Sequence, residues 1–118
     1  MYNFLGLYEE AIAAYDQALA IQPDDHDAFY NKGSAMYNLE RYEEAIAAFD
    51  QALVIQPDDH EAFYGKGIAM YNLERYEEAI AAFDQALAIK PDKHEAFYGR
   101  GIALHNLGRY EEAIAAFE

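Results

Sequence analysis

The 118-residue sequence contains no cysteine, has only 8 Lys and Arg residues against 22 Asp and Glu, and has no long apolar run. Without cysteine, the chain has no disulfides, thiolate metal sites or thiol nucleophiles. The net charge of −14 would repel a phosphate backbone, so we expect no nucleic-acid partner. There is neither a cationic, apolar leader nor a stretch of about 20 apolar residues, so we expect a cytoplasmic protein with no membrane partner.

The apolar content is high enough for a packed core. Hydrophobic residues make up 53% of the chain and aromatic residues 15%. Disordered segments are much poorer in such residues. We therefore expect residues 1–118 to fold as one domain.

A 34-residue period divides the chain. Residues 26–59 and 60–93 are two complete copies that differ at six positions, and residues 1–25 and 94–118 are partial copies. Within each copy, apolar residues recur at helical spacing in two separate stretches. In the first complete copy the stretches are Phe29, Gly33, Met36 and Leu39, then Tyr42, Ala45, Phe49 and Ala52. Each copy is therefore predicted to form two antiparallel helices.

Local signals predict the helix ends. Pro57 ends one helix, and Asp58, with Glu61 three residues later, is the predicted cap of the next, as are Asp92 and Glu95 one copy on. The turn inside a copy is predicted at residues 39–41, where Gly108 occupies the corresponding place in the last copy. In the first partial copy we expect the helix to run from about Tyr8 to Ile21.

These residues resemble the tetratricopeptide repeat, whose pattern is W-x2-L-G-x2-Y, then A-x3-F, then P. The matching residues of one copy are Phe63, Lys66, Gly67, Met70, Ala79, Phe83 and Pro91. The resemblance covers the whole chain and implies an all-α, right-handed superhelical solenoid of antiparallel helix hairpins. Phe replaces Trp, Met or Leu replaces Tyr, and Lys or Arg replaces Leu. We expect the cationic stems to lie on the core with their charge in solvent.

The resemblance further implies a protein-interaction scaffold that binds a peptide or helix of a partner along its first helices. The predicted binding residues are Tyr30, Ser34, Tyr37, Asn38, Tyr64, Ile68, Tyr71, Asn72, Tyr98, Ile102, His105 and Asn106. Tyrosine and asparagine suit such a surface because they combine apolar area with hydrogen-bonding groups. Two other roles stay open: the tyrosines could pack between helices, and the asparagines could cap last turns.

Charge narrows the class of partner. Family members that hold a C-terminal carboxylate use Lys, Asn and Arg, whereas this chain places tyrosines Tyr30, Tyr64 and Tyr98 and acids Asp27, Glu61 and Glu95 there. We expect no carboxylate clamp and a partner that is basic or apolar. The four segments carry −5, −5, −2 and −2, so a basic partner would favour the N-terminal half. Solubility is the other interpretation of this charge.

No catalytic, cofactor or metal constellation is recognisable, so we expect no enzyme activity. His26, His60 and His94 occur once per copy and are interpreted as polar residues at helix starts. The glycines beside Lys66 lie inside a predicted helix, where they permit close packing and form no phosphate loop.

Two further hypotheses concern the partial copies. Residues 1–16 correspond position for position to residues 103–118, so one chain could associate head to tail with another or exchange end helices with it. A self-assembly module is thus the alternative function, and an accessory segment of a larger enzyme is a third. The near-identity of the copies fits either a natural array or an engineered consensus.

Overall fold

The computed structural model describes residues 4–108 and 115–116, and within them every regular element is an α-helix. The helices are α1 (Phe4–Ile21), α2 (His26–Asn38), α3 (Tyr42–Ile55), α4 (His60–Asn72), α5 (Tyr76–Ile89) and α6 (His94–Asn106). They fall into two compact units, Met1–Pro57 and Asp58–Glu118. The predicted all-α class of helix hairpins is confirmed.

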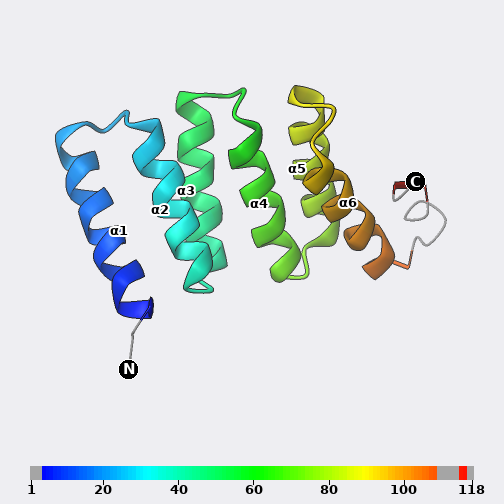
Figure 1. Cartoon of the computed structure of the whole chain (residues 1–118), viewed down its shortest axis with the longest axis horizontal. Helices are drawn as coiled ribbons and strands as arrows, with labels where there is room; N and C mark the ends of the chain where they lie inside the picture. Colours follow the sequence, from blue (N-terminus) through cyan, green and yellow to red (C-terminus); the bar gives the residue numbers. More distant parts are fainter. Residues whose placement is uncertain (1–3, 109–114, 117–118) are drawn as a thin grey trace. The chain divides into compact units, whose positions relative to one another are not determined.

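The first unit contains α1, α2 and α3, which run antiparallel in succession (Figure 1). α2 contacts both α1 and α3. The core of this unit includes Ala45 and Ala52 of α3, which are fully buried, and Phe49 of the same helix, which is 2% exposed. The predicted apolar stripe of α3 is therefore its packed face.

The second unit repeats this hairpin with α4 and α5 and adds α6, which packs on α5 and touches α4. Phe83 takes the place of Phe49, and Leu104 of α6 is also fully buried. Leu104 clusters with Ile80 and Ala103.

Asp25 and Asp59 cap the first helices of the two complete copies. Asp59 accepts hydrogen bonds from the amides of Glu61 (2.9 Å) and Ala62 (3.2 Å). The prediction that Asp58 is the cap was wrong by one residue, because Asp58 belongs to the turn after Pro57 while residue 59 has the extended backbone that a cap requires. The Asp92 prediction fails similarly: Lys93 is the cap residue of α6, with no side-chain capping bond.

The turn inside each copy lies where it was predicted. Glu40 and Glu74 adopt left-handed backbone conformations with φ of 62° and 61°, and Gly108 does so with φ of 77°. The amide of Arg41 donates to the carbonyl of Met36 at 2.9 Å, and that of Arg75 to Met70 at 2.9 Å. These bonds satisfy carbonyls that the end of the first helix leaves open.

Helix α1 begins earlier than predicted, at Phe4 instead of Tyr8. Gly6 and Leu7 stand where the left-handed Glu40 and the helix-start Arg41 stand in the next copy. The helix of the first partial copy therefore runs through the positions at which the turn lies in the next copy.

Ion pairs join consecutive helices within each unit. In the first unit, Nζ of Lys32 on α2 lies 2.6 Å from Oδ1 of Asp16 on α1. In the second unit, Nε of Arg100 on α6 lies 2.8 Å from Oδ1 of Asp84 on α5. The cations occupy the same repeat position, and each pairs with the acid 16 residues earlier. The acidic partners are half exposed, so the charged groups of Lys32 and Arg100 lie at the surface, where each also pairs with a carboxylate of the preceding helix.

Candidate functional site

Eight of the predicted binding residues lie on the two first helices of the second unit. Tyr64, Ile68, Tyr71 and Asn72 are on α4, and Tyr98, Ile102, His105 and Asn106 are on α6. They recur at helical spacing, and α4 touches α6 directly. We call this set the α4–α6 face. The remaining four, Tyr30, Ser34, Tyr37 and Asn38, share α2 in the first unit.

One hydrogen bond ties the α4–α6 face together. Nδ2 of Asn106 donates to the hydroxyl oxygen of Tyr71 at 2.9 Å. The Tyr71 ring is also held by an edge-to-face contact with Tyr76 of α5, with centroids 5.4 Å apart. Tyr71 is thus fixed on two sides and half-buried, and a partner would meet an ordered ring.

The asparagines also act on their own helices. Nδ2 of Asn38, Asn72 and Asn106 donates to the carbonyl four residues earlier, at 2.9, 2.7 and 2.7 Å. Since Nδ2 of Asn106 makes two bonds, its side-chain oxygen is the group still able to bond a partner. The capping role is therefore present and leaves an acceptor on the face.

The first tyrosine of each copy contributes to hairpin packing. The ring centroids of Tyr30 and Phe49 are 5.7 Å apart, and those of Tyr64 and Phe83 are 5.9 Å apart. Both tyrosines are half-buried. Tyr98 differs because it is 55% exposed. Packing and partner contact are compatible here, since each ring has two faces.

Lys93 is a residue of this region that the sequence prediction missed. Its side chain is 6% exposed, and its Nζ pairs with the carboxylate of Glu61. The same Nζ lies 5.1 Å from the ring centroid of Tyr64. The signal available in the sequence was the change from Asp59 to Lys93 at the last position of the copy.

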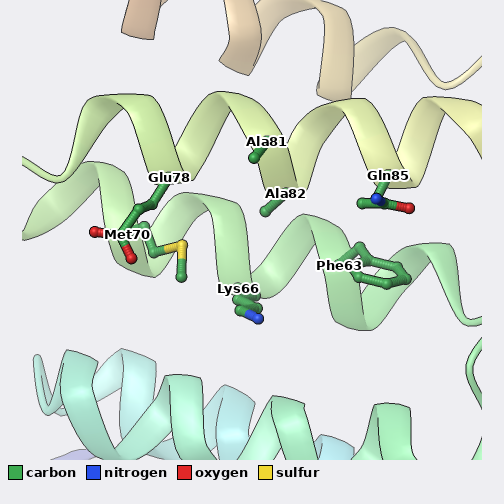
Figure 2. Close-up of a pocket in the computed structure, with 7 residues that line it drawn as sticks. All are labelled: Phe63, Lys66, Met70, Glu78, Ala81, Ala82 and Gln85. Atoms are coloured by element: carbon green, nitrogen blue, oxygen red, sulfur yellow. The ribbon is translucent and has the colours of Figure 1, made fainter.

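A cleft on each hairpin was also missed. In the second unit it has a volume of about 440 Å³. Figure 2 shows that the residues lining it come from two neighbouring helices, α4 and α5. Its lining residues are Phe63, Lys66, Met70, Glu78, Ala81, Ala82 and Gln85. The first unit has a cleft of about 280 Å³ lined by the seven residues at the same repeat positions. Identity at all seven positions was the sequence signal.

The cleft of the first unit lies beside a helix. Its Lys32 is the residue that pairs with Asp16 of α1. This side of the α2–α3 hairpin is therefore used to hold the preceding helix. The arrangement indicates a packing role for the cleft, and the α4–α6 face is the stronger candidate for an external partner.

The described residues offer neither a metal-binding cluster nor a membrane span. Within residues 4–108 and 115–116, no three His, Cys, Asp or Glu side chains gather as a metal site would require. In the same part of the chain, no helix combines the length and the apolar character needed to cross a bilayer. His26, His60 and His94 are the first residues of α2, α4 and α6, as predicted.

Comparison with known proteins identifies the family. A family model described as tetratricopeptide repeat matches residues 4–60, 39–94 and 64–118. The chain belongs to the tetratricopeptide-repeat family. This confirms the resemblance seen in the 34-residue pattern. A comparison with curated proteins gave no match.

Solved structures of MamA are similar to this tetratricopeptide-repeat chain. One crystal structure of MamA shows 26% identity and a TM-score of 0.91, over 95% of this chain and 66% of that one. A second has the same identity, score and coverage of this chain, over 61% of the MamA chain. A MamA fragment from Desulfovibrio magneticus RS-1 shows 25% identity and a TM-score of 0.89, over 96% and 64%. The chain thus spans slightly less than two thirds of these relatives.

Proposed function

We propose that this tetratricopeptide-repeat chain is a protein-interaction scaffold that binds a peptide or helix of a partner protein on its α4–α6 face. The main support for this proposal is the ordered surface made by Tyr71 and Asn106. Nδ2 of Asn106 on α6 donates a hydrogen bond to the hydroxyl of Tyr71 on α4 at 2.9 Å. Ile68 and Ile102 are half-buried at matching positions of α4 and α6 and add apolar area. Rigid aromatic and aliphatic groups beside hydrogen-bond acceptors are the usual anchors of a protein interface.

The chemistry of this face favours some partners over others. Glu61 and Glu95 occur at its start, and Lys93, the nearby cation, is already paired with Glu61. A carboxylate tail would therefore meet repulsion, while a basic or apolar segment would not. Tetratricopeptide repeats are generally non-enzymatic, and the proposal assigns no catalytic role. We propose that the first unit also contacts a partner protein through its first helix, α2, by Tyr30, Ser34, Tyr37 and Asn38.

A peptide selected by phage display on the immobilised chain tests the binding face. We expect Tyr71→Ala and Ile102→Ala each to weaken its binding by about tenfold, the loss expected for a buried interface anchor. Gln85→Ala, in the cleft on α5, is the matched control and should leave affinity unchanged. Circular dichroism checks that each variant is folded. Equal affinity for all variants would refute the α4–α6 face.

Self-association is the second candidate function, and exposed apolar residues favour it. Phe4, Leu5 and Leu7 of α1 are 62%, 60% and 43% exposed. Apolar groups gathered on one turn are typical of contact surfaces. Light scattering over a concentration series should show a mass that rises with concentration, and Leu5→Lys should suppress the rise. A constant monomer mass at high concentration would contradict this candidate.

A further inference from the structure

The hydrogen bond between Tyr71 and Asn106 can have only one direction. Nδ2 of Asn106 donates to the backbone carbonyl of Ile102 at 2.7 Å and to the hydroxyl oxygen of Tyr71 at 2.9 Å. A backbone carbonyl only accepts hydrogen bonds, so the bond to Ile102 identifies the nitrogen end of the Asn106 amide. Because an amide nitrogen accepts no hydrogen bond, Tyr71 is the acceptor in the second bond. Both hydrogens of Nδ2 are therefore used.

This arrangement leaves one donor and one acceptor side by side. Tyr71 keeps its own hydroxyl hydrogen, and Asn106 keeps Oδ1, which is attached to the same carbon as the bonded Nδ2. Among the residues that the structure describes, none accepts that hydrogen and none donates to that oxygen. Asn106 is exposed and Tyr71 is half-buried, so a ligand can reach both groups and replace the water around them.

A side-chain amide is the group that matches this pair. Its N–H can donate to Oδ1 of Asn106 while its oxygen accepts from the hydroxyl of Tyr71. A carboxylate has no hydrogen for Oδ1, and an ammonium or guanidinium group has no acceptor for the hydroxyl. A trans main-chain peptide group directs its N–H and C=O to opposite sides, whereas a primary amide has an N–H beside its oxygen. The hydrogen-bonding groups therefore favour glutamine or asparagine.

We propose that Tyr71 and Asn106 form a site for the side-chain amide of a glutamine or asparagine in a partner polypeptide. The inference deepens the proposed function and rests on it for the binding of the partner to the α4–α6 face. Both groups are held before a ligand arrives. The ring of Tyr71 lies 5.4 Å from that of Tyr76, between centroids, and Asn106 is bonded to Ile102. Such preorganisation lowers the ordering cost of binding.

Phage display on the immobilised chain tests which residue type the site selects. Peptides selected on the parent chain should be enriched in glutamine or asparagine at one position, and Tyr71→Phe should abolish the enrichment. Tyr15→Phe on α1 is the matched control, because it also removes one hydroxyl and phenylalanine stands at the same repeat position in Phe49 and Phe83. It should keep the enrichment. Selection of serine, threonine or charged residues at that position, or of no residue type, would contradict the amide site.

One selected glutamine peptide then measures the strength of the site. Replacing its glutamine by methionine keeps a similar length and removes the amide. This change should weaken binding by about two- to tenfold for each of the two hydrogen bonds lost. Glutamate should weaken binding further, because its carboxylate would place an oxygen against Oδ1 of Asn106 and carry negative charge toward a chain of net charge −14.

A double-mutant cycle links this loss to Tyr71. Tyr71→Phe keeps the ring and removes the hydroxyl, so it should reduce affinity for the glutamine peptide about two- to tenfold more than affinity for the methionine peptide. Added salt should not change this ratio, because neither partner group is charged. In NMR titrations, the side-chain amide signal of Asn106 should shift more with the glutamine peptide than with the methionine peptide.

Equal effects of Tyr71→Phe on the two peptides would overturn the amide site. That result would leave the α4–α6 face as the binding surface, because the loss of affinity expected for Ile102→Ala does not depend on the glutamine. The failure of this inference is therefore distinguishable from the failure of the proposed function, in which Ile102→Ala would also have no effect.

Discussion

The ring of Phe83 lies directly against the backbone of Gly67. A Cβ added at Gly67 would be 2.6 Å from Cε1 of Phe83, and one added at Gly99 would be 2.6 Å from its Cζ. Phe83 is 1% exposed, and these glycines of α4 and α6 both lie against its ring. The prediction that glycines of the first helices permit close packing is thereby confirmed for Gly67 and Gly99. In the first unit, a Cβ added at Gly33 would likewise lie 2.8 Å from Cε1 of Phe49.

Alanine at these glycines should destabilise the fold. We expect Gly67→Ala and Gly33→Ala each to cost about 1–3 kcal/mol, because overpacking a closed core forces side chains off their preferred rotamers. This loss competes with a gain of about 1 kcal/mol from replacing glycine inside a helix. Ser34→Ala, next to Gly33, is the control and should be nearly neutral. Urea unfolding followed by circular dichroism measures the differences, and a stabilised Gly67→Ala would contradict the packing.

The cap of α4 can be tested with two neighbouring aspartates. Asp59→Ala should lower the free energy of unfolding by about 0.5–2 kcal/mol, because the amides of Glu61 and Ala62 lose their acceptor. Asp58→Ala removes the same charge one residue earlier and should have little effect. Thermal unfolding of the two variants gives the comparison. Equal losses would show that charge near the helix start matters and the capping bond does not.

Acid should weaken the second unit partly through Glu78. Hydrogen bonds from Arg75, the largest cause, lower the pKa of Glu78 below its ordinary value. The unfolded chain therefore takes up the proton first as pH falls. The stabilisation is present above about pH 4.3, the ordinary value for Glu, and is lost as pH falls through the lower folded-state pKa.

The variant Glu78→Gln should accordingly lose less stability than the parent chain between neutral pH and pH about 3. Glu77→Gln, which removes an adjacent charge, is the control. Urea midpoints across this pH range supply the measurement. If the stability of both variants depends on pH as that of the parent chain does, Glu78 does not contribute to the loss of stability in acid.

Much of the fold was predictable because the 34-residue period repeats every local signal. The two hairpins, the left-handed turn at Glu40 and the packed face around Phe49 all follow from that period. The start of α1 at Phe4 did not follow from that period, which places a turn at Gly6 and Leu7. Whether residues 1–118 form one domain remains a prediction.

The candidate site was predictable only as a set of positions. Spacing placed Tyr71 and Asn106 on first helices, but their hydrogen bond depends on how two helices pack. The pairing of Lys93 with Glu61 joins residues 32 apart in sequence, and its burial follows from the packing of α6 beside α4. Side-chain partners of this kind are set by tertiary contacts, which periodicity alone does not encode.

The most direct test of the central claim is NMR mapping of a display-selected peptide on the isotope-labelled chain. We predict that the largest amide shifts occur on the α4–α6 face, at Ile68, Tyr71, Ile102 and His105, with little change along α5. If the largest shifts instead occurred at Ala81 and Gln85, in the cleft between α4 and α5, the proposed binding face would be contradicted.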